Sequence, residues 1–226
     1  MRGRDCGIST SPDATGGCRA EFSLEPGSAR QGCSLRPFPE RRWASALDFA
    51  NTIDNRGDRR GPDLLHSYDD VVVLAQRPGL IDEEQMAGLS AFAKAHPRRA
   101  EASLKEAVIL REAIYTLFLS EDACQPYPHQ AFEIVHDIAT RARARQVLSK
   151  AEDGFRWLLP LKDPSDLVAL FAVSAVELIT GRNGRRLIRQ CKGDNCGWLF
   201  LDTSKSGRRL WCSEATCGTH ARVKRF

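Results

Sequence analysis

Two cysteine pairs decide how the chain ends: Cys191-Lys-Gly-Asp-Asn-Cys196-Gly-Trp-Leu-Phe-Leu-Asp202 and, after a basic turn, Trp211-Cys212-Ser-Glu-Ala-Thr-Cys217. Each pair has four residues between its cysteines, and fifteen residues separate the two pairs. Zinc takes four ligands at tetrahedral corners, and two close pairs on separate turns can supply them. The spacing predicts one zinc ion held by Cys191, Cys196, Cys212 and Cys217, with four unrelated buried cysteines as the alternative.

The residues around the cysteines predict a turn, a hairpin and a helix. Residues 198–201 have the composition of a strand, residues 203–207 that of a turn, and residues 208–211 are expected to return beside the first strand. A helix is expected after Ser213. So short a segment buries too little surface to fold alone, so metal binding would supply its folding energy.

Four thiolates would fill the coordination sphere of the zinc ion and leave no position for water. Such a closed site is structural rather than catalytic. The rest of the sequence contains no phosphate-binding glycine loop, no nucleophile elbow and no His-Glu-x-x-His helix. We therefore expect a protein that is not an enzyme; zinc bound by three cysteines and a water would instead indicate a metalloenzyme.

Positive charge is concentrated around the cysteine pairs. The chain of 226 residues has a formal net charge of +4, whereas residues 182–226 alone contain 11 Lys and Arg against 3 Asp and Glu. Residues 41–181 contain 17 against 21. A basic end on a mildly acidic body is typical of a polyanion-binding segment, so we expect double-stranded DNA as a partner. The predicted contacts are Lys205, Arg208, Arg209, Arg222, Lys224 and Arg225.

Two other interpretations of this charge remain open. The basic residues can pack against the acidic body or a protein partner, which would make the zinc module an interaction module without DNA contact. They can also simply keep a small zinc module soluble. A homodimer is a further expectation, because one small finger offers few contacts to DNA.

The body between residues 41 and 181 is predicted to be mainly α-helical, bundle-like, with one β-hairpin. Apolar residues recur at helical spacing, Ser67 and Asp82 are expected N-caps, and Pro97 is expected to open the longest helix. Residues 1–40 are predicted to be poorly structured, either a mobile tail or the result of a start codon placed too far upstream. The predicted elements are helices at 41–54, 67–77, 82–96, 97–120, 129–145 and 163–181, and hairpin strands at 146–150 and 155–159.

Three polar residues of the first predicted helix, Asp48, Asn51 and Thr52, fall on roughly one side. They are candidates for lining a small-molecule pocket, although such residues more often tie a neighbouring loop. The effector itself cannot be named from the sequence. The chain lacks a run of 18 apolar residues and a secretory signal, so we expect no membrane partner and a reducing, cytoplasmic location.

The residues around the second cysteine pair resemble the CGNR zinc finger. The resemblance is carried by Cys196-Gly-Trp-Leu-Phe-Leu-Asp-Thr-Ser204, Gly207-Arg-Arg-Leu-Trp-Cys-Ser213 and Ala221-Arg-Val-Lys-Arg-Phe226. Leu47-Asp-Phe-Ala-Asn-Thr52 resembles the ABATE domain that precedes this finger. The resemblance implies a bacterial, stress-induced transcription regulator with a mostly helical body and a small treble-clef or ribbon-like finger at residues 182–226. One departure stands at the signature itself, where Thr219-His220 replaces the family's Asn-Arg.

Overall fold

A computed structural model of the chain describes the backbone of residues 40–151 and 154–224. The predicted tail at residues 1–40 lies almost entirely outside the described residues, as does Arg225. The prediction of a mainly helical protein with a hairpin and a small C-terminal cysteine module is confirmed. Among the described residues, no helix is both long and apolar enough to cross a membrane.

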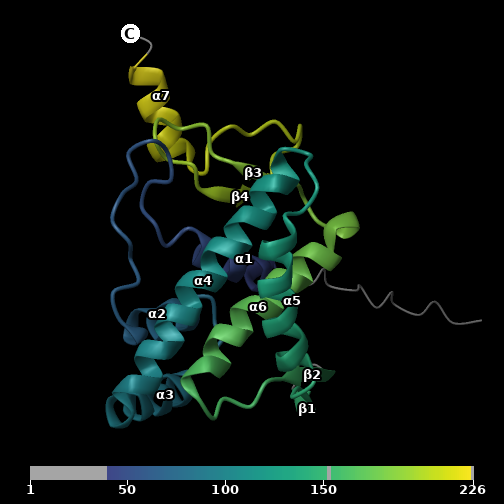
Figure 1. The fold of residues 1–226 in the computed structure, drawn as a ribbon. Helices are drawn as coiled ribbons and strands as arrows, with labels where there is room; N and C mark the ends of the chain where they lie inside the picture. Colours follow the sequence, from purple (N-terminus) through teal and green to yellow (C-terminus); the bar gives the residue numbers. More distant parts are fainter. Residues whose placement is uncertain (1–39, 152–153, 225–226) are drawn as a thin grey trace, which may run out of the picture. The chain divides into compact units, whose positions relative to one another are not determined.

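The core is built around α6 (Pro164–Thr180), which other helices surround (Figure 1). Its sequence is apolar on almost every side, and residues 166–169 and 171–175 are buried. Asp163 caps its start by accepting a hydrogen bond from the Ser165 backbone N–H at 2.9 Å. The ring of Phe171 stacks on that of Phe49 with 4.3 Å between centroids, which joins α6 to α1 (Glu40–Ala50).

The remaining body helices follow the predicted order. Ser67 and Asp82 form the capping boxes that begin α2 and α3, and Pro97 occupies the first turn of α4. The body elements are α2 (Tyr68–Gln76), α3 (Glu83–Ala95), α4 (Pro97–Asp122), α5 (His129–Arg143), β1 (Val147–Ala151) and β2 (Gly154–Leu158). The predicted hairpin is confirmed, because β1 and β2 pair antiparallel.

The first helix is shorter than predicted. It ends at Ala50 rather than Asp54, because the chain turns and its polar groups bond elsewhere. Thr52 Oγ1 donates to the Phe49 carbonyl at 2.8 Å. Ile53 then forms an antiparallel bridge with Asp63, which closes a loop between them.

The small C-terminal sheet differs from the predicted one. β4 (Leu199–Leu201) pairs with β3 (Ile188–Gln190), the strand before the first cysteine, and not with residues 208–211. The first cysteine pair therefore lies on the connection between two paired strands, where it forms a tight knuckle. Residues 208–211 instead form an irregular return, in which the Leu210 carbonyl accepts from the Lys192 N–H at 2.9 Å. The remaining elements are η1 (Arg182–Gly184), η2 (Glu214–Gly218) and α7 (Thr219–Val223), which confirms a helix after Ser213.

An ion pair between the buried Arg111 and the partly exposed Asp63 holds the loop after α1 against α4. The side chain of Arg111 is 1 % exposed and donates to both carboxylate oxygens of Asp63, at 2.6 and 2.8 Å. Burial disfavours ionisation of Asp63, but the bonds from Arg111 and from the Leu65 N–H outweigh it and lower the pKa of Asp63. Removing this carboxylate would leave a buried guanidinium with fewer acceptors.

We expect Asp63→Ala to lower the free energy of unfolding by about 2 kcal/mol at pH 7, less than for a fully buried pair because Asp63 is partly exposed. Since the folded pKa of Asp63 is depressed, its stabilisation is present above its unfolded pKa of about 4 and lost as pH falls through the folded value. The difference between variant and wild type in urea titrations should therefore shrink below about pH 4. Asp58→Ala in the same loop is the control and should change stability by less than about 0.5 kcal/mol; equal losses from both variants would contradict the role of Asp63.

Candidate metal centre

The first pair of cysteines is presented by the knuckle between β3 and β4. The Cys196 N–H donates to the Gly193 carbonyl at 3.1 Å, and the Gly193 N–H donates to Cys191 Sγ at 3.3 Å. Asn195 has a φ of +62°, a left-handed conformation that asparagine tolerates well. A side chain on Gly193 would place its Cβ 2.9 Å from Cys217 Sγ, so only glycine lets the two turns meet.

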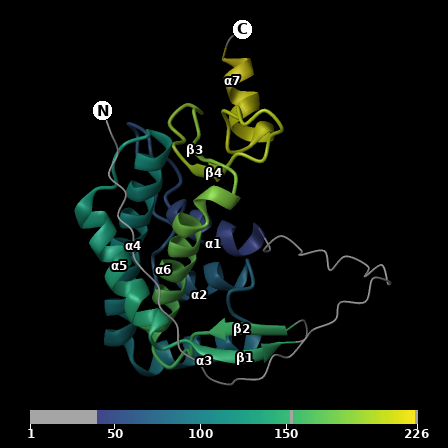
Figure 2. The ribbon, with the colours of Figure 1, turned by 90° about the vertical axis from the view of Figure 1, so that its right-hand side faces the viewer.

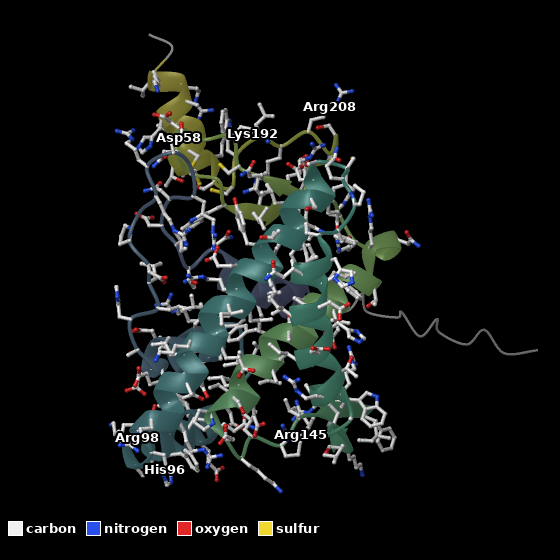
Figure 3. All side chains as sticks on the ribbon, viewed as in Figure 1. Asp58, His96, Arg98, Arg145, Lys192 and Arg208 are labelled. Atoms are coloured by element: carbon white, nitrogen blue, oxygen red, sulfur yellow. The ribbon has the colours of Figure 1, made fainter. Side chains whose placement is uncertain are left out.

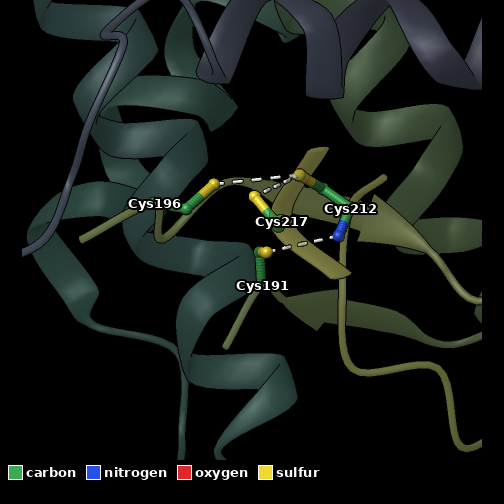
Figure 4. A group of neighbouring side chains, drawn as sticks. All are labelled: Cys191, Cys196, Cys212 and Cys217. Carbon is green, nitrogen blue, oxygen red and sulfur yellow. Dashed lines mark hydrogen bonds between the residues drawn. The ribbon is translucent and has the colours of Figure 1, made fainter. Parts of the chain in front are cut away.

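The second pair begins at the end of the irregular return and continues into η2. The Cys212 N–H donates to Cys191 Sγ at 3.2 Å, which joins the two pairs directly (Figure 4). Ser213 caps η2 by accepting from the Thr216 N–H, and Cys217 follows within that helix. The helix therefore fixes the direction of the last ligand.

The four predicted ligand atoms come together, with all Sγ atoms within 4.8 Å of one another. Cys196 and Cys212 Sγ are 3.7 Å apart, and Cys212 and Cys217 Sγ are 3.8 Å apart. Tetrahedral zinc with Zn–S bonds of about 2.3 Å requires S–S separations of about 3.8 Å. The donor set and spacing fit one structural zinc ion.

The thiols of this group do not ionise equally on their own. Burial raises the pKa of Cys196 to about 12, and the neighbouring Cys191 and Cys217 add to the shift. Burial likewise raises the pKa of Cys212. Burial opposes ionisation of Cys191 too, but the N–H groups of Cys212 and Gly193 outweigh it and lower its pKa. A bound zinc ion would stabilise all four as thiolates, so metal binding releases protons and supplies folding energy.

The knuckle is docked on the body by backbone hydrogen bonds. In the loop after α1, the Arg56 N–H donates to the Cys196 carbonyl at 2.8 Å and the Gly57 N–H to the Asn195 carbonyl at 3.1 Å. The Asn195 side chain accepts from the Arg59 N–H at 2.7 Å and donates to the Arg59 carbonyl. A Cβ on Gly57 would lie 2.7 Å from the Asn195 Cα, so this approach also requires glycine.

Side chains of the body bind the strand that follows the knuckle. The Asn51 amide donates to the Leu199 carbonyl at 2.8 Å and accepts from the Leu199 N–H at 2.9 Å, as a neighbouring strand would. The Trp198 indole N–H donates to the Ile53 carbonyl at 2.7 Å, and the Tyr115 hydroxyl donates to the Gly197 carbonyl at 2.8 Å. The cysteine module and the helical body are therefore joined through residues 47–53 and α4.

A second ion pair fixes the chain where it enters the small sheet. Arg185 donates to both carboxylate oxygens of Glu121 at 2.8 and 2.9 Å, and both side chains are almost fully buried. These docking contacts join residues more than 60 positions apart, and sequence reasoning missed those of Arg56, Tyr115 and Asn195. The loop glycines were the only sequence signal of a close approach.

The three residues predicted to line a pocket lie together. Asp48, Asn51 and Thr52 line a cavity of about 720 Å³ between α1, α2 and β4. Asn51 and Thr52 also have the partners described above, so tying neighbouring segments is part of their role. Asp48 is exposed at this cavity and has no hydrogen bond or ion pair among the described residues. Ligand binding here stays a prediction.

The predicted DNA-contact residues fall into two groups. Lys205 and Arg208 are exposed and have no ion pair among the described residues, and Arg208 projects outward (Figure 3). Arg209 instead donates within the finger, to the carbonyls of Trp211 and Cys212, and lies over the ring of Phe200 at 4.8 Å. Arg222 pairs with Glu214, and Lys224 pairs with Asp194 at 2.9 Å.

The fold and the site define a helical protein with a C-terminal structural zinc finger. Residues 44–182 match the ABATE family, described as "Putative stress-induced transcription regulator". Residues 187–226 match the CGNR zinc finger. The chain therefore belongs to the ABATE family and carries a CGNR zinc finger, which confirms the resemblance. A comparison with curated proteins found no similar one.

The departure from the family signature does not touch the four ligands. Thr219 Oγ1 donates to the Glu214 carbonyl at 3.2 Å, and His220 is exposed and outside the cysteine group. Thr219 also accepts from Arg222 at 3.4 Å, so the replaced positions help hold the start of α7.

We expect Cys212→Ser to lower the zinc content from one ion per chain toward zero, because three thiolates and a hydroxyl bind zinc poorly. The finger should lose amide protection while the body helices keep most of the far-ultraviolet circular dichroism. Cys124→Ser, at an exposed cysteine in the turn after α4, is the matched control and should retain the ion. Full zinc content in the Cys212 variant would show that this cysteine is not a ligand.

The Asn51 side-chain amide bonds both backbone groups of Leu199. Removing this amide should loosen the finger without removing its metal. In Asn51→Ala the Leu199 backbone loses two partners in a partly buried place, at a cost of about 1–3 kcal/mol. Hydrogen exchange of β4 amides should rise roughly tenfold or more for each 1.4 kcal/mol lost. Asp48→Ala, one turn earlier on α1, should leave these amides unchanged. Unaltered hydrogen exchange in the Asn51 variant would show that the Asn51 amide does not hold β4 in place.

Proposed function

We propose that the protein is a zinc-dependent transcription regulator whose finger binds double-stranded DNA, while the helical body senses a signal or dimerises. The observation that carries this proposal is a hydrogen-bonded basic turn after β4, at residues 203–208. Its two cations, Lys205 and Arg208, are exposed and unpaired among the described residues. Phosphate oxygens are partners for such cations.

The buried carboxylate of Asp202 holds the turn through hydrogen bonds to both of its ends. Asp202 is 1 % exposed and accepts from the N–H groups of Ser204 and Arg209 at 3.0 and 2.9 Å, and from the Ser204 hydroxyl at 2.5 Å. Burial opposes ionisation of Asp202, but these donors, first those of Ser204, outweigh it and lower its pKa. Arg189 lies 3.5 Å from the same carboxylate and donates to the Gly207 carbonyl at 2.6 Å. A turn held in this way loses little conformational freedom on binding.

A third cation, Arg186, has no ion pair among the described residues and extends the basic turn. Arg186 is exposed just before β3, and the neighbouring Leu187 carbonyl accepts from the Asp202 N–H at 2.8 Å. We call Arg186, Lys205 and Arg208 the basic turn surface. Arg222 in α7 and Lys224 directly after it instead pair with carboxylates of the finger, those of Glu214 and Asp194. These surface pairs are weak and exchange partners easily, so α7 contributes less net attraction to a phosphate backbone.

The metal has a structural part in this proposal. Four thiolates leave zinc no open position, so we propose that it organises the finger and performs no chemistry, and that the protein is not an enzyme. When bound, zinc supplies the energy that brings the two cysteine pairs together. The residues of the chain then present the basic turn surface.

We expect duplex DNA binding that weakens steeply with salt and that chelation abolishes, measured by fluorescence anisotropy on a random duplex. Lys205→Ala with Arg208→Ala should reduce the slope of log affinity against log salt by about 2 and weaken binding roughly tenfold or more near 0.15 M salt. The matched pair Arg222→Ala with Lys224→Ala should have a smaller effect on both, because these cations are already paired.

The outcomes separate the candidate functions. No retention of zinc-loaded protein on any duplex at low salt would overturn DNA binding and favour a protein-interaction module. If both double variants lose the same amount of DNA affinity, the proposal of DNA binding stands, but the preference for the basic turn surface is disproved. Both double variants should keep full zinc content, which checks that the finger remains folded.

A further inference from the structure

The cavity between the helical body and the finger has the size and lining of a ligand site. In Figure 2, α1 lies between α2 and β4, and residues of all three elements line a space of about 720 Å³. Small-molecule sites have volumes of roughly 300–1,000 Å³. The lining is mainly apolar, and two of its side chains, Leu64 and Val73, are 47 % and 45 % exposed. A bound molecule would therefore gain free energy by covering apolar surface that the described chain leaves open.

Two opposite charges at this cavity form no ion pair among the described residues. Asp48 on α1 and Arg77 at the end of α2 both line it, and neither side chain has a hydrogen bond to a described residue. Burial raises the pKa of Asp48 and the positive charge of Arg77 opposes this rise, so the two groups are near each other. Asp70 also lines the cavity, but its carboxylate is already used by the N–H groups of His66 and Ser67.

The strand β4 offers a backbone donor at the same cavity. Leu199 bonds the Asn51 amide through both its N–H and its C=O, so its polar groups point away from β3. Leu201 lies two residues further along β4, so its N–H points to the same side. The Leu201 carbonyl accepts from the Thr203 N–H, whereas the Leu201 N–H bonds to no described acceptor. Since Leu201 lines the cavity, this N–H is available to a carbonyl group of a ligand.

These three features favour a short apolar peptide with free ends. Arg77 would repel a ligand with only a positive charge, and Asp48 would repel a ligand with only a negative charge. A peptide carries an ammonium at one end and a carboxylate at the other, so it meets both side chains. Its apolar side chains match the lining, and its amide carbonyl matches the Leu201 N–H, as when a peptide is recognised along a strand edge. A free amino acid has no amide carbonyl for this donor.

We propose that the cavity binds an apolar dipeptide, with the ammonium group at Asp48, the carboxylate at Arg77 and the amide carbonyl at the Leu201 N–H. The dipeptide contacts α1, α2 and β4 together, so its binding stabilises the docked position of the finger. This inference rests on the proposed sensing role of the helical body, for which it supplies the class of signal.

The test titrates leucyl-leucine into the zinc-loaded full chain by isothermal titration calorimetry, in the absence of DNA. We expect a dissociation constant below about 1 mM. Two matched probes, the N-acetyl derivative and the C-terminal amide of leucyl-leucine, each lack one charge. Each should bind at least about threefold more weakly, because one charged side chain of the cavity is then left without its partner. Hydrogen exchange of the β4 amides should slow when leucyl-leucine is bound.

Two changes of nearly equal shape show which end of the peptide lies at which side chain. In Asp48→Asn, the N-acetyl derivative should bind at least as tightly as leucyl-leucine, while the C-terminal amide should remain the weaker ligand. Arg77→Gln should give the opposite result. Asp137→Asn changes an exposed carboxylate of α5 outside the cavity, so this control should bind all three peptides as wild type does. All three variants should keep full zinc content, which checks the fold.

The outcomes separate this proposal from the proposed function. Absence of leucyl-leucine binding with a dissociation constant below about 1 mM would overturn the dipeptide site. Equal affinity for capped and uncapped peptides would also overturn it, because the two charges would then have no part in recognition. The titration contains no DNA, so its failure leaves the DNA-binding proposal standing. Failure of the DNA-binding experiment would likewise leave the measured peptide affinity unchanged.

Discussion

The backbone pairing between the loop after α1 and the zinc knuckle is the contact on which the arrangement of the chain depends. Arg56 and Gly57 donate to the carbonyls of Cys196 and Asn195, within the segment that presents two zinc ligands. A bound zinc ion would be held by Cys191 and Cys196 and would fix the knuckle whose carbonyls accept from the body. Because Asn51 and Tyr115 then bind the next residues, metal binding and body packing are thermodynamically linked.

The contacts between finger and body also decide which positive charges of the finger already have a partner. Arg185 is used in a buried pair with Glu121, and Arg209 holds carbonyls near the second cysteine pair. The excess of positive charge counted from the sequence is thus larger than the charge available to a partner. Among the described residues, the exposed cations Arg186, Lys205 and Arg208 have no ion pair, and they lie at or beside the turn after β4 that Asp202 fixes. A charge count locates a binding segment, but the surface within it depends on which cations the fold has already used.

Local patterns made most of the fold predictable. Ser67 and Asp82 were recognisable caps, and the paired spacing of Cys191 and Cys196 with Cys212 and Cys217 indicated the metal site. The predicted end of α1 was wrong because Asn51 bonds to Leu199 and the Thr52 carbonyl accepts from the Leu64 N–H, and these contacts override helical spacing. The partner of β4 was wrong because Ile188–Gln190 is too short to be recognised as a strand. Contacts such as Tyr115 with Gly197 join residues 82 positions apart and leave no local pattern.

The absence of a side chain at residue 57 has a consequence for how such chains can recombine. Any Cβ there would meet the Asn195 backbone, so a body with alanine at this position excludes a finger docked in this way. Body and finger are thus not freely exchangeable modules, although two separate families describe them. A hybrid of one chain's body and another chain's finger would keep this docked geometry only if the body has a glycine at the position of Gly57 and the finger has an asparagine at the position of Asn195.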